Sequence, residues 1–368
     1  MTTRRSGGRQ PWRRVLFALV LVAATIGLAR TSPPAVGHPL RVESVRDIGP
    51  LVGPPGWLRD GAQSIQLGSR ILWTFGDTLF PVLAVDGSLL RTNTAAWSDR
   101  SHPRVLHGPV DANGAPVQFI PFTESEEVFN QPGSGDRIAV WPTSIIRRGP
   151  DSAAVLFATV KVGPGTLNYT FLGTGVATVS AGSSAAARRP EPVFRPPDPS
   201  FANGAVMVGA LVYVYGCARI EGLQLGCRVA RTTVTDIGER SAYRFWDGSG
   251  WSSKVGSAVV TLPGPSGGLS VSWNPWLGRY LSVYNLALTN RVEMRTALSP
   301  EGPWSRPVTA FTGRSTDPGR LNNLAFEHPE LASDGGRTVT ISYTHPVGAR
   351  GGEIRLVEVT FARPGDVR

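Results

Sequence analysis

The sequence has little charge and almost no lysine. Only 17% of its 368 residues are charged, and Lys161 and Lys254 are the only lysines among 37 basic residues. A hydrophobic fraction of 41% excludes a disordered chain and is enough for a large core. Because the arginines are scattered and form no basic helix, we attribute their excess to a GC-rich genome and expect no nucleic-acid partner.

Long hydrophobic runs are scarce, and residues 15–29 form the one that stands out. This run, "VLFALVLVAATIGLA", follows the basic stretch "MTTRRSGGRQPWRR" and ends in small residues, which predicts a secretory signal peptide over residues 1–29. It is shorter than the roughly 20 residues of a membrane span. An uncleaved N-terminal anchor is the alternative, and it would be the only contact with the membrane. A cut after Ala29 removes five arginines and no acid, which lowers the net charge from +10 to +5.

Cysteine is almost absent, since Cys217 and Cys227 are the only two. They lie ten residues apart in "YGCARIEGLQLGCRVA", with glycines and a plausible turn between them. In an exported protein, two cysteines facing each other across a hairpin predict a disulfide. A metal site is the alternative, but no histidine lies near enough in the sequence to complete it.

Helical periodicity is also nearly absent after a proline-rich linker at residues 30–42. Short apolar runs alternate with Gly, Pro and Asp turns, which is typical of an all-β fold. Five hairpin-like segments begin 59 to 79 residues apart and predict a five-bladed β-propeller over residues 43–362, followed by a C-terminal tail at 363–368. A pair of β-sandwiches is the rival fold. The five segments are 62–77, 141–160, 203–216, 269–285 and 328–344.

The segments between these hairpins have mostly structural interpretations. The stretches 243–253 and 296–308 predict strand–turn–strand corners whose tryptophans, Trp246, Trp251 and Trp304, pack between blades rather than on sugars. Residues 181–200 predict a proline-rich surface loop. The polar segment 100–135 is expected to cover one face, and Glu124, Glu126 and Glu127 within it to lie in a solvated loop.

The first hairpin, "RDGAQSIQLGSRILWTFGDT" at residues 59–78, has an acidic residue near each outer end. If Gly68 and Ser69 form a type II′ turn, the register places Asp60 directly opposite Asp77. Two carboxyls that close should not ionise equally, which suits acid and base catalysis on a glycosidic bond. The alternative is structural: Asp77 forms a turn with Thr78, and Asp60 pairs with Arg59 or another arginine.

Four further residues are candidates for substrate binding. In an extended strand, His328 and Glu330 point to one face and Glu327 to the other, so His328 and Glu330 are expected to face the channel. Glu330 is the second choice for the general acid. Trp141 is a candidate for stacking on a sugar ring, and Asn203 for donating to a hydroxyl. The alternatives are that His328 or Glu330 holds a central ion, that His328 is an edge residue stacked beside Pro329, and that Trp141 belongs to the core. The five histidines show no metal-ligand spacing.

The hairpin at 59–78, together with "GGLSVSWNPWLGRYLSVYN", "MRTALSPEGPWS" and "HPEL…ISYT", resembles a bacterial propeller family. That family was once catalogued only as a domain of unknown function and is associated with endo-D-arabinanases that cut the arabinan of actinobacterial cell walls. The resemblance covers roughly residues 43–362. It implies that Asp60 and Asp77 are the catalytic carboxylates. Segments 100–135 and 181–200 depart from the family pattern, which leaves the cleaved linkage open.

The sequence therefore predicts an exported glycoside hydrolase that acts on an arabinofuranose-containing polysaccharide of the cell envelope. It implies no organic cofactor, and no ligand motif supports a structural calcium ion. The alternative is a propeller that binds glycan or protein at the envelope without cleaving it, because fold alone does not fix function.

Overall fold

The computed structural model describes residues 40–131, 135–165, 168–221, 224–315, 319–347 and 351–363. The chain divides into two units, Met1–Ser32 and Pro33–Arg368, and every described residue belongs to the second. The predicted signal peptide, most of the linker and residues 364–368 lie outside the described residues. Within the described part, no helix is both long and apolar enough to span a membrane.

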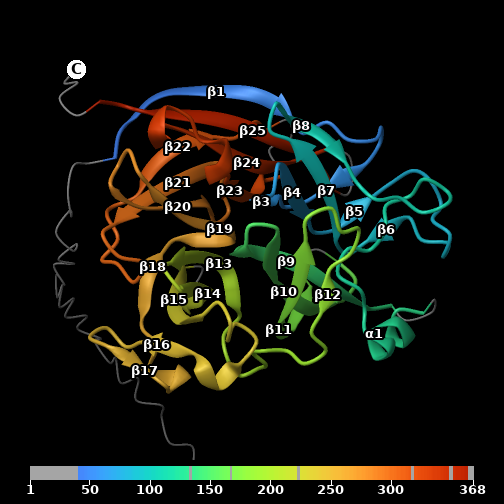
Figure 1. The fold of residues 1–368 in the computed structure, drawn as a ribbon, viewed down its shortest axis with the longest axis horizontal. Helices are drawn as coiled ribbons and strands as arrows, with labels where there is room; N and C mark the ends of the chain where they lie inside the picture. The colour runs from blue at the N-terminus through green and yellow to red at the C-terminus, as the bar shows by residue number, and fades with distance from the viewer. Residues whose placement is uncertain are drawn as a thin grey trace, which may run out of the picture. The chain divides into compact units, whose positions relative to one another are not determined.

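The described strands form five antiparallel sheets (Figure 1). In chain order, the first four sheets begin with β3, β9, β13 and β19. The first comprises β3 (Gln63–Leu67), β4 (Arg70–Phe75), β7 (Thr94–Asp99) and β8 (His102–His107). The second comprises β9 (Arg137–Gly149), β10 (Ser152–Val162), β11 (Tyr169–Ser180) and β12 (Ala187–Arg188).

The third and fourth sheets continue this order along the chain. The third comprises β13 (Phe201–Val208), β14 (Leu211–Glu221), β15 (Gln224–Thr233), β16 (Arg244–Trp246), β17 (Trp251–Ser252) and β18 (Val260–Pro263). The fourth comprises β19 (Pro265–Asn274), β20 (Arg279–Leu286), β21 (Arg291–Ala297) and β22 (Val308–Thr312).

The fifth sheet combines strands from both ends of the described chain. In Figure 1, β1 from the start lies alongside β25 near the end, and the two strands pair from Val42–Phe361 to Pro50–Arg355. The sheet comprises β1 (Val42–Pro50), β2 (Leu58–Arg59), β5 (Thr78–Leu79), β6 (Leu90–Arg91), β23 (Asn323–Glu327), β24 (Thr338–Pro346) and β25 (Gly352–Phe361).

Helices contribute little to the described chain. The one α-helix there is α1 (Glu124–Phe129), and the short 3₁₀ helices are η1 (Arg240–Ala242), η2 (Val255–Ser257), η3 (Pro329–Leu331) and η4 (Asp334–Gly336).

The sheets are arranged like the blades of a propeller. Their first strands contact one another in chain order, from β3 through β9, β13 and β19 to β23. The predicted all-β, propeller-like fold is therefore confirmed. The count of five equivalent blades stays a prediction, because the seven-stranded sheet includes the short strands β2, β5 and β6 as well as β23, β24 and β25.

Most of the apolar core lies between neighbouring sheets. One cluster joins the first and second sheets through Leu72 and Val155, and another joins the first and fifth through Trp73 and Leu356. Three further clusters join the second to the third, the third to the fourth and the fourth to the fifth. Burial of apolar area, at roughly 25 cal/mol per Å², is thus distributed around the whole ring of sheets.

The third sheet carries the disulfide. Cys217 on β14 and Cys227 on β15 are directly opposite in the ladder, and their sulfurs are 2.03 Å apart. Trp246, Trp251 and Trp304 pack with the cluster between the third and fourth sheets, as expected for core tryptophans.

Two segments differ from their predicted roles. Residues 181–200 are more than a surface loop, because they contain β12 and bury Val193 and Phe194 in the core. Residues 124–129 form α1 rather than a solvated loop, since Thr123 and Glu126 make a reciprocal capping box at its start. Arg188 then binds the Glu126 carboxylate at 2.5 Å, which fixes the helix against the second sheet.

Candidate functional site

Asp60 and Asp77 face each other across the first hairpin. The ladder runs in one register from Leu67–Arg70 to Gln63–Thr74, and the same register resumes at Arg59–Thr78. Between these stretches, the Asp60 N–H donates to the Asp77 carbonyl at 3.1 Å, and the Gly76 N–H donates to the Asp60 carbonyl at 2.8 Å. The predicted turn is also present, because Gly68 adopts φ 57°.

Gly76 makes room for the carboxyl of Asp60. A Cβ atom at position 76 would lie 2.3 Å from Asp60 Oδ1, closer than real Cβ contacts allow. On the opposite side of the break, Gly61 adopts φ 59° and donates its N–H to Thr344 Oγ1 at 3.0 Å. These two glycines interrupt the ladder without shifting its register, and so place the Asp60 carboxyl against the backbone of the neighbouring strand.

Two residues from the second sheet hold Asp77. Arg137 donates from Nη2 to Asp77 Oδ2 at 2.5 Å and from Nη1 to Oδ1 at 3.4 Å. The indole N–H of Trp141 donates to Oδ1 at 2.9 Å. Because Arg137 and Trp141 are four residues apart on β9, both side chains emerge from the same face of that strand. A charged and a neutral donor together stabilise the ionised carboxylate of Asp77.

Asp60 has a different electrostatic environment. Burial, and then the negative charge of Asp77, raise its pKa to about 8. The backbone N–H of Asp77 and the charge of Arg137 oppose this rise without cancelling it. Burial and the charge of Asp77 therefore favour the protonated form of Asp60. One carboxyl that can donate a proton and one that can accept a proton or attack a carbon are the two groups that hydrolysis of a glycosidic bond requires.

The structural alternative, in which the aspartates only form a turn and an ion pair, is confirmed in part. Arg59 does not pair with Asp60. Its guanidinium lies 5.0 Å from the ring centre of Trp57 and 4.5 Å from that of Phe75. Asp77 does bind an arginine, but this is Arg137 of the next sheet.

His328 and Glu330 do not lie on an extended strand, and the prediction that both face the channel holds only for Glu330, which lines the central cavity. Strand β23 ends at Glu327, and Pro329 begins the 3₁₀ helix η3. His328 is fully buried against Trp73, with ring centres 4.8 Å apart. Its Nδ1 lies 2.5 Å from Ser64 Oγ, and the Ser64 hydroxyl donates to Glu330. Burial lowers the pKa of His328 to about 3 and raises the pKa of Glu330.

The side-chain oxygen of Asn203 is engaged with the backbone, and its predicted role as a donor to a substrate hydroxyl stays a prediction. Its side-chain oxygen accepts the N–H of Cys217 at 2.9 Å, across an irregularity in the pairing of β13 with β14. This contact uses the oxygen of Asn203 within the third sheet.

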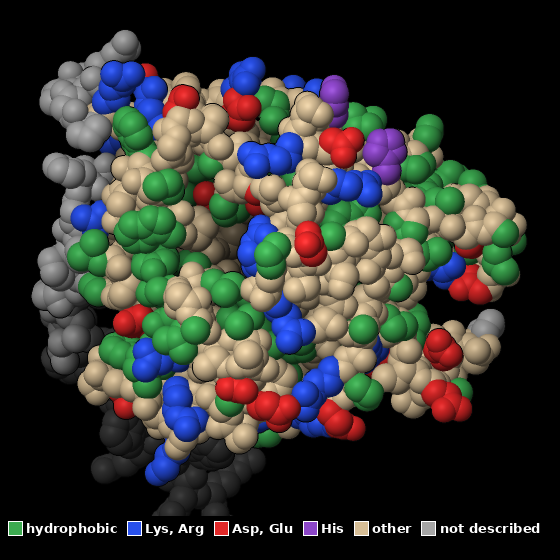
Figure 2. Space-filling view, viewed as in Figure 1, with side chains coloured by type: hydrophobic (Ala, Val, Ile, Leu, Met, Phe, Trp, Pro, Cys, Tyr) green, Lys and Arg blue, Asp and Glu red, His purple; other side chains and the backbone are tan. Residues whose placement is uncertain are grey.

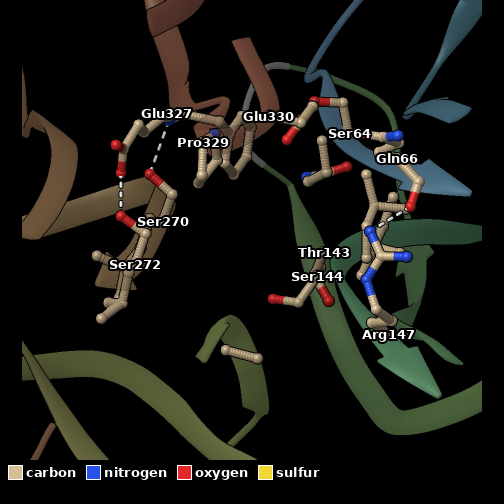
Figure 3. Close-up of a pocket in the computed structure, with 17 residues that line it drawn as sticks. Ser64, Gln66, Thr143, Ser144, Arg147, Ser270, Ser272, Glu327, Pro329 and Glu330 are labelled. Carbon is tan, nitrogen blue, oxygen red and sulfur yellow. Dashed lines mark hydrogen bonds between the residues drawn. The ribbon is translucent and has the colours of Figure 1, made fainter. Parts of the chain in front are cut away.

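A cavity of about 450 Å³ lies between the first strands of the sheets (Figure 3). Figure 2 shows the viewed face hollowed near its centre, with acidic and basic side chains interspersed across that face. The cavity is lined by residues of β3, β9, β13, β19 and β23 and by Pro329 and Glu330 of η3. Asp60, Asp77, Trp141 and Asn203 are not among them. Its polar lining residues are Gln63, Ser64, Gln66, Thr143, Ser144, Arg147, Ser270, Ser272, Glu327 and Glu330.

Glu327 is the buried acid of this cavity, although the sequence pattern placed it on the face away from the channel. Ser272 donates to its Oε2 at 2.5 Å, and its own N–H donates to Ser270 Oγ at 2.7 Å. Burial raises the pKa of Glu327 to about 7. In Figure 3, Glu327 with these serines lies across the cavity from Ser64, Gln66 and Arg147.

Sequence reasoning missed Arg137, Ser64 and the inward position of Glu327. A signal for Arg137 existed, because it lies four residues before Trp141 and so shares its face if the strand begins earlier than 141. Among the described residues, no group of three or more His, Cys, Asp or Glu side chains is placed to hold a metal ion.

The fold and the carboxyl pair define an all-β, propeller-like protein with two adjacent acidic side chains, of which one has a pKa raised by burial and the other binds Arg137 and Trp141. The chain belongs to the family described as Domain of unknown function (DUF4185), whose profile matches residues 60–345. That match begins at Asp60. No curated protein sequence matches the chain significantly.

Solved structures with a similar fold include two glycoside hydrolases. One, described as "Glycoside hydrolase", has a TM-score of 0.51 at 10% identity over 89% of this chain and 95% of its own. The other is a GH43_1 enzyme from Xanthomonas citri complexed with xylose, with a TM-score of 0.50 at 15% identity over 87% of this chain and 92% of its own. At these identities, the similarity shows the shared fold alone.

Proposed function

We propose that the protein is a glycoside hydrolase that cleaves an arabinofuranose-containing, D-arabinan-like polysaccharide of the cell envelope. The observation that carries the proposal is the contrast between Asp60, whose pKa burial and the charge of Asp77 raise to about 8, and Asp77, whose carboxylate binds Arg137 and Trp141. Asp60 acts as the general acid, and Asp77 acts as the base or nucleophile. The glycoside hydrolases with a similar fold make this chemistry plausible for the scaffold.

The choice of arabinan rests on the sequence resemblance described above. The seven-stranded sheet would be the fifth blade of a five-bladed propeller, closed by β1. Export rests on the basic N-terminus, the apolar run at 15–29 and the Cys217–Cys227 disulfide. N-terminal sequencing of the protein recovered outside the cell tests export, and a first residue after position 29 supports a cleaved signal.

The test of activity is incubation of the purified protein with D-arabinan and analysis of the released oligosaccharides. Wild type should release them, and Asp60→Asn and Asp77→Asn should each lose about 10²- to 10⁴-fold in rate. Glu330→Gln is the matched control, because Glu330 is another acid whose pKa is raised by burial and it belongs to the central cavity. Activity that survives both aspartate substitutions, or that depends on Glu330 instead, would contradict the assignment.

A second function, glycan binding without cleavage, is favoured by one observation. Both oxygens of Asp77 already have donors from Arg137 and Trp141, as in a purely structural ion pair. Retention of D-arabinan by the wild type without release of products would identify this function.

A further inference from the structure

Tyr169 is an exposed aromatic residue that connects to Asp77 through Trp141. It begins β11, and 54% of it is exposed. Its ring packs edge-on against Trp141, with ring centres 5.8 Å apart and planes at 76°. Trp141 is the residue whose indole N–H binds Asp77. A chain of direct contacts thus leads from the carboxylate to an exposed aromatic ring.

The register of the second sheet explains why Tyr169 lies there. Val162 on β10 pairs with Arg137 on one side and with Tyr169 on the other. Residues directly opposite each other in a ladder point to the same face of a sheet. Arg137, Trp141 and Tyr169 therefore share the face that contacts Asp77.

The core does not require an aromatic residue at position 169. Trp141 and Phe171 pack against the small cluster of Ala139, Ala158 and Val160, and Tyr169 is not part of it. The exposed tyrosine offers a large apolar ring with a polar hydroxyl at its edge, a combination that suits contact with a ligand that is part apolar and part polar.

The surroundings of Tyr169 favour a neutral ligand. The two basic residues nearest in the sheet already pair with acids: Arg137 binds Asp77, and Lys161 lies 3.2 Å from Asp136. An anionic ligand would have to compete with these carboxylates. An uncharged sugar ring offers apolar C–H groups to the ring face and hydroxyls to its edge.

We propose that Tyr169 stacks on a furanose ring of the substrate in a subsite next to Asp77, and that Trp141 is a positioning residue which orients Asp77. This inference rests on the proposed function and assigns its substrate-binding surface. It also revises the role of Trp141, because its N–H is engaged with the carboxylate. The stacking role passes to Tyr169, whose ring is the more exposed of the pair.

The test compares Tyr169→Ala, Tyr169→Phe and Trp141→Phe in the arabinan assay. Tyr169→Ala should raise KM about three- to tenfold with little change in kcat, as expected for one aromatic contact. Tyr169→Phe should restore most of the wild-type KM, because it keeps the ring. Trp141→Phe should instead lower kcat and change its pH profile, because it removes a donor from Asp77.

Leu172→Ala is the control, since Leu172 is an exposed residue of the same strand and should leave KM unchanged. An active wild type with unchanged KM in Tyr169→Ala overturns the subsite alone. A lowered kcat at normal KM would also overturn it. A wild type that neither cleaves nor retains D-arabinan overturns the proposed function and the subsite together.

Discussion

Asp60 and Asp77 are opposite each other in one hairpin, yet their carboxyls meet different surroundings. Arg137 and Trp141 reach across from the second sheet to Asp77, whereas burial and the charge of Asp77 dominate at Asp60 and raise its pKa to about 8. The asymmetry therefore has two sources: burial acts on Asp60, and one neighbouring strand, β9, supplies both side-chain donors to Asp77.

The first prediction concerns the pH dependence of catalysis. Because Asp60 must be protonated to act as the acid, kcat should fall about tenfold per pH unit above pH 8. A carboxyl NMR resonance with a midpoint near pH 8 should be present in the wild type and absent from Asp60→Asn. In Asp77→Asn, the midpoint should move down, because the negative charge that helps raise it is gone. A midpoint near 4 in the wild type would contradict this picture.

The second prediction concerns Arg137. Arg137→Gln should lower kcat/KM about 10- to 100-fold, because the half-buried carboxylate of Asp77 loses its charged partner. It should also raise the pKa of Asp60 further, because the charge of Arg137 normally lowers it. The alkaline limb of the pH profile should therefore lie at higher pH in Arg137→Gln. This shift is opposite in sign to the lowered Asp60 midpoint expected in Asp77→Asn.

Arg147→Gln is the control for this pair of shifts. Arg147 is an exposed arginine at the central cavity that donates to the backbone carbonyl of Gln66, so its loss should leave the profile unchanged. A profile that responds equally to both arginine substitutions would indicate a general charge effect in place of a local one.

The third prediction tests the close approach at Gly76. Gly76→Ala should displace the Asp60 carboxyl, because the new Cβ would lie 2.3 Å from its oxygen. We expect a loss of at least about tenfold in kcat, since small misplacements of a catalytic group are costly. Gly250→Ala is the matched control, because a Cβ there meets nothing within 4 Å. Activity assays with circular dichroism separate loss of the site from loss of the fold.

The geometry of the first hairpin could be predicted from sequence because it depends on local rules. Gly68 and Ser69 set the turn, and the period of two then determines every pair outward to Asp60 and Asp77. The same register resumes beyond Gly61 and Gly76, where the ladder is interrupted, because the same number of residues separates the two paired stretches on each strand. The partner of Asp77 could not be found this way, because Arg137 is 60 residues away in another sheet.

The fifth hairpin shows where the same rule fails. A period of two predicts that His328 and Glu330 share a face, but the chain leaves the extended conformation at Pro329 and forms η3. Pro329 has no N–H to donate to the ladder, and strand β23 ends shortly before it, at Glu327. Glu327, the last strand residue, takes the inward position, and His328 turns to pack on Trp73.

The fourth prediction concerns stability, and it uses two buried groups with opposite pKa shifts. His328 has a pKa lowered to about 3, so between pH 3 and about 6.5 the unfolded chain binds more protons, and stability rises with pH. Glu327 has a pKa raised to about 7, so between about 4.5 and 7 the folded chain binds more protons, and stability falls as pH rises. The two effects oppose each other where their windows overlap.

Substitution separates these contributions in urea unfolding measured from pH 3.5 to 8. His328→Asn, which retains a donor toward Ser64, should lose part of the destabilisation that the wild type shows on acidification below pH 4.5. Glu327→Gln, which still accepts from Ser272, should lose part of the decline above pH 6.5. Each effect has an upper limit of about 1.4 kcal/mol per pH unit, the slope for one proton. Parallel stability curves for the wild type and both variants would show that neither group titrates with a shifted pKa.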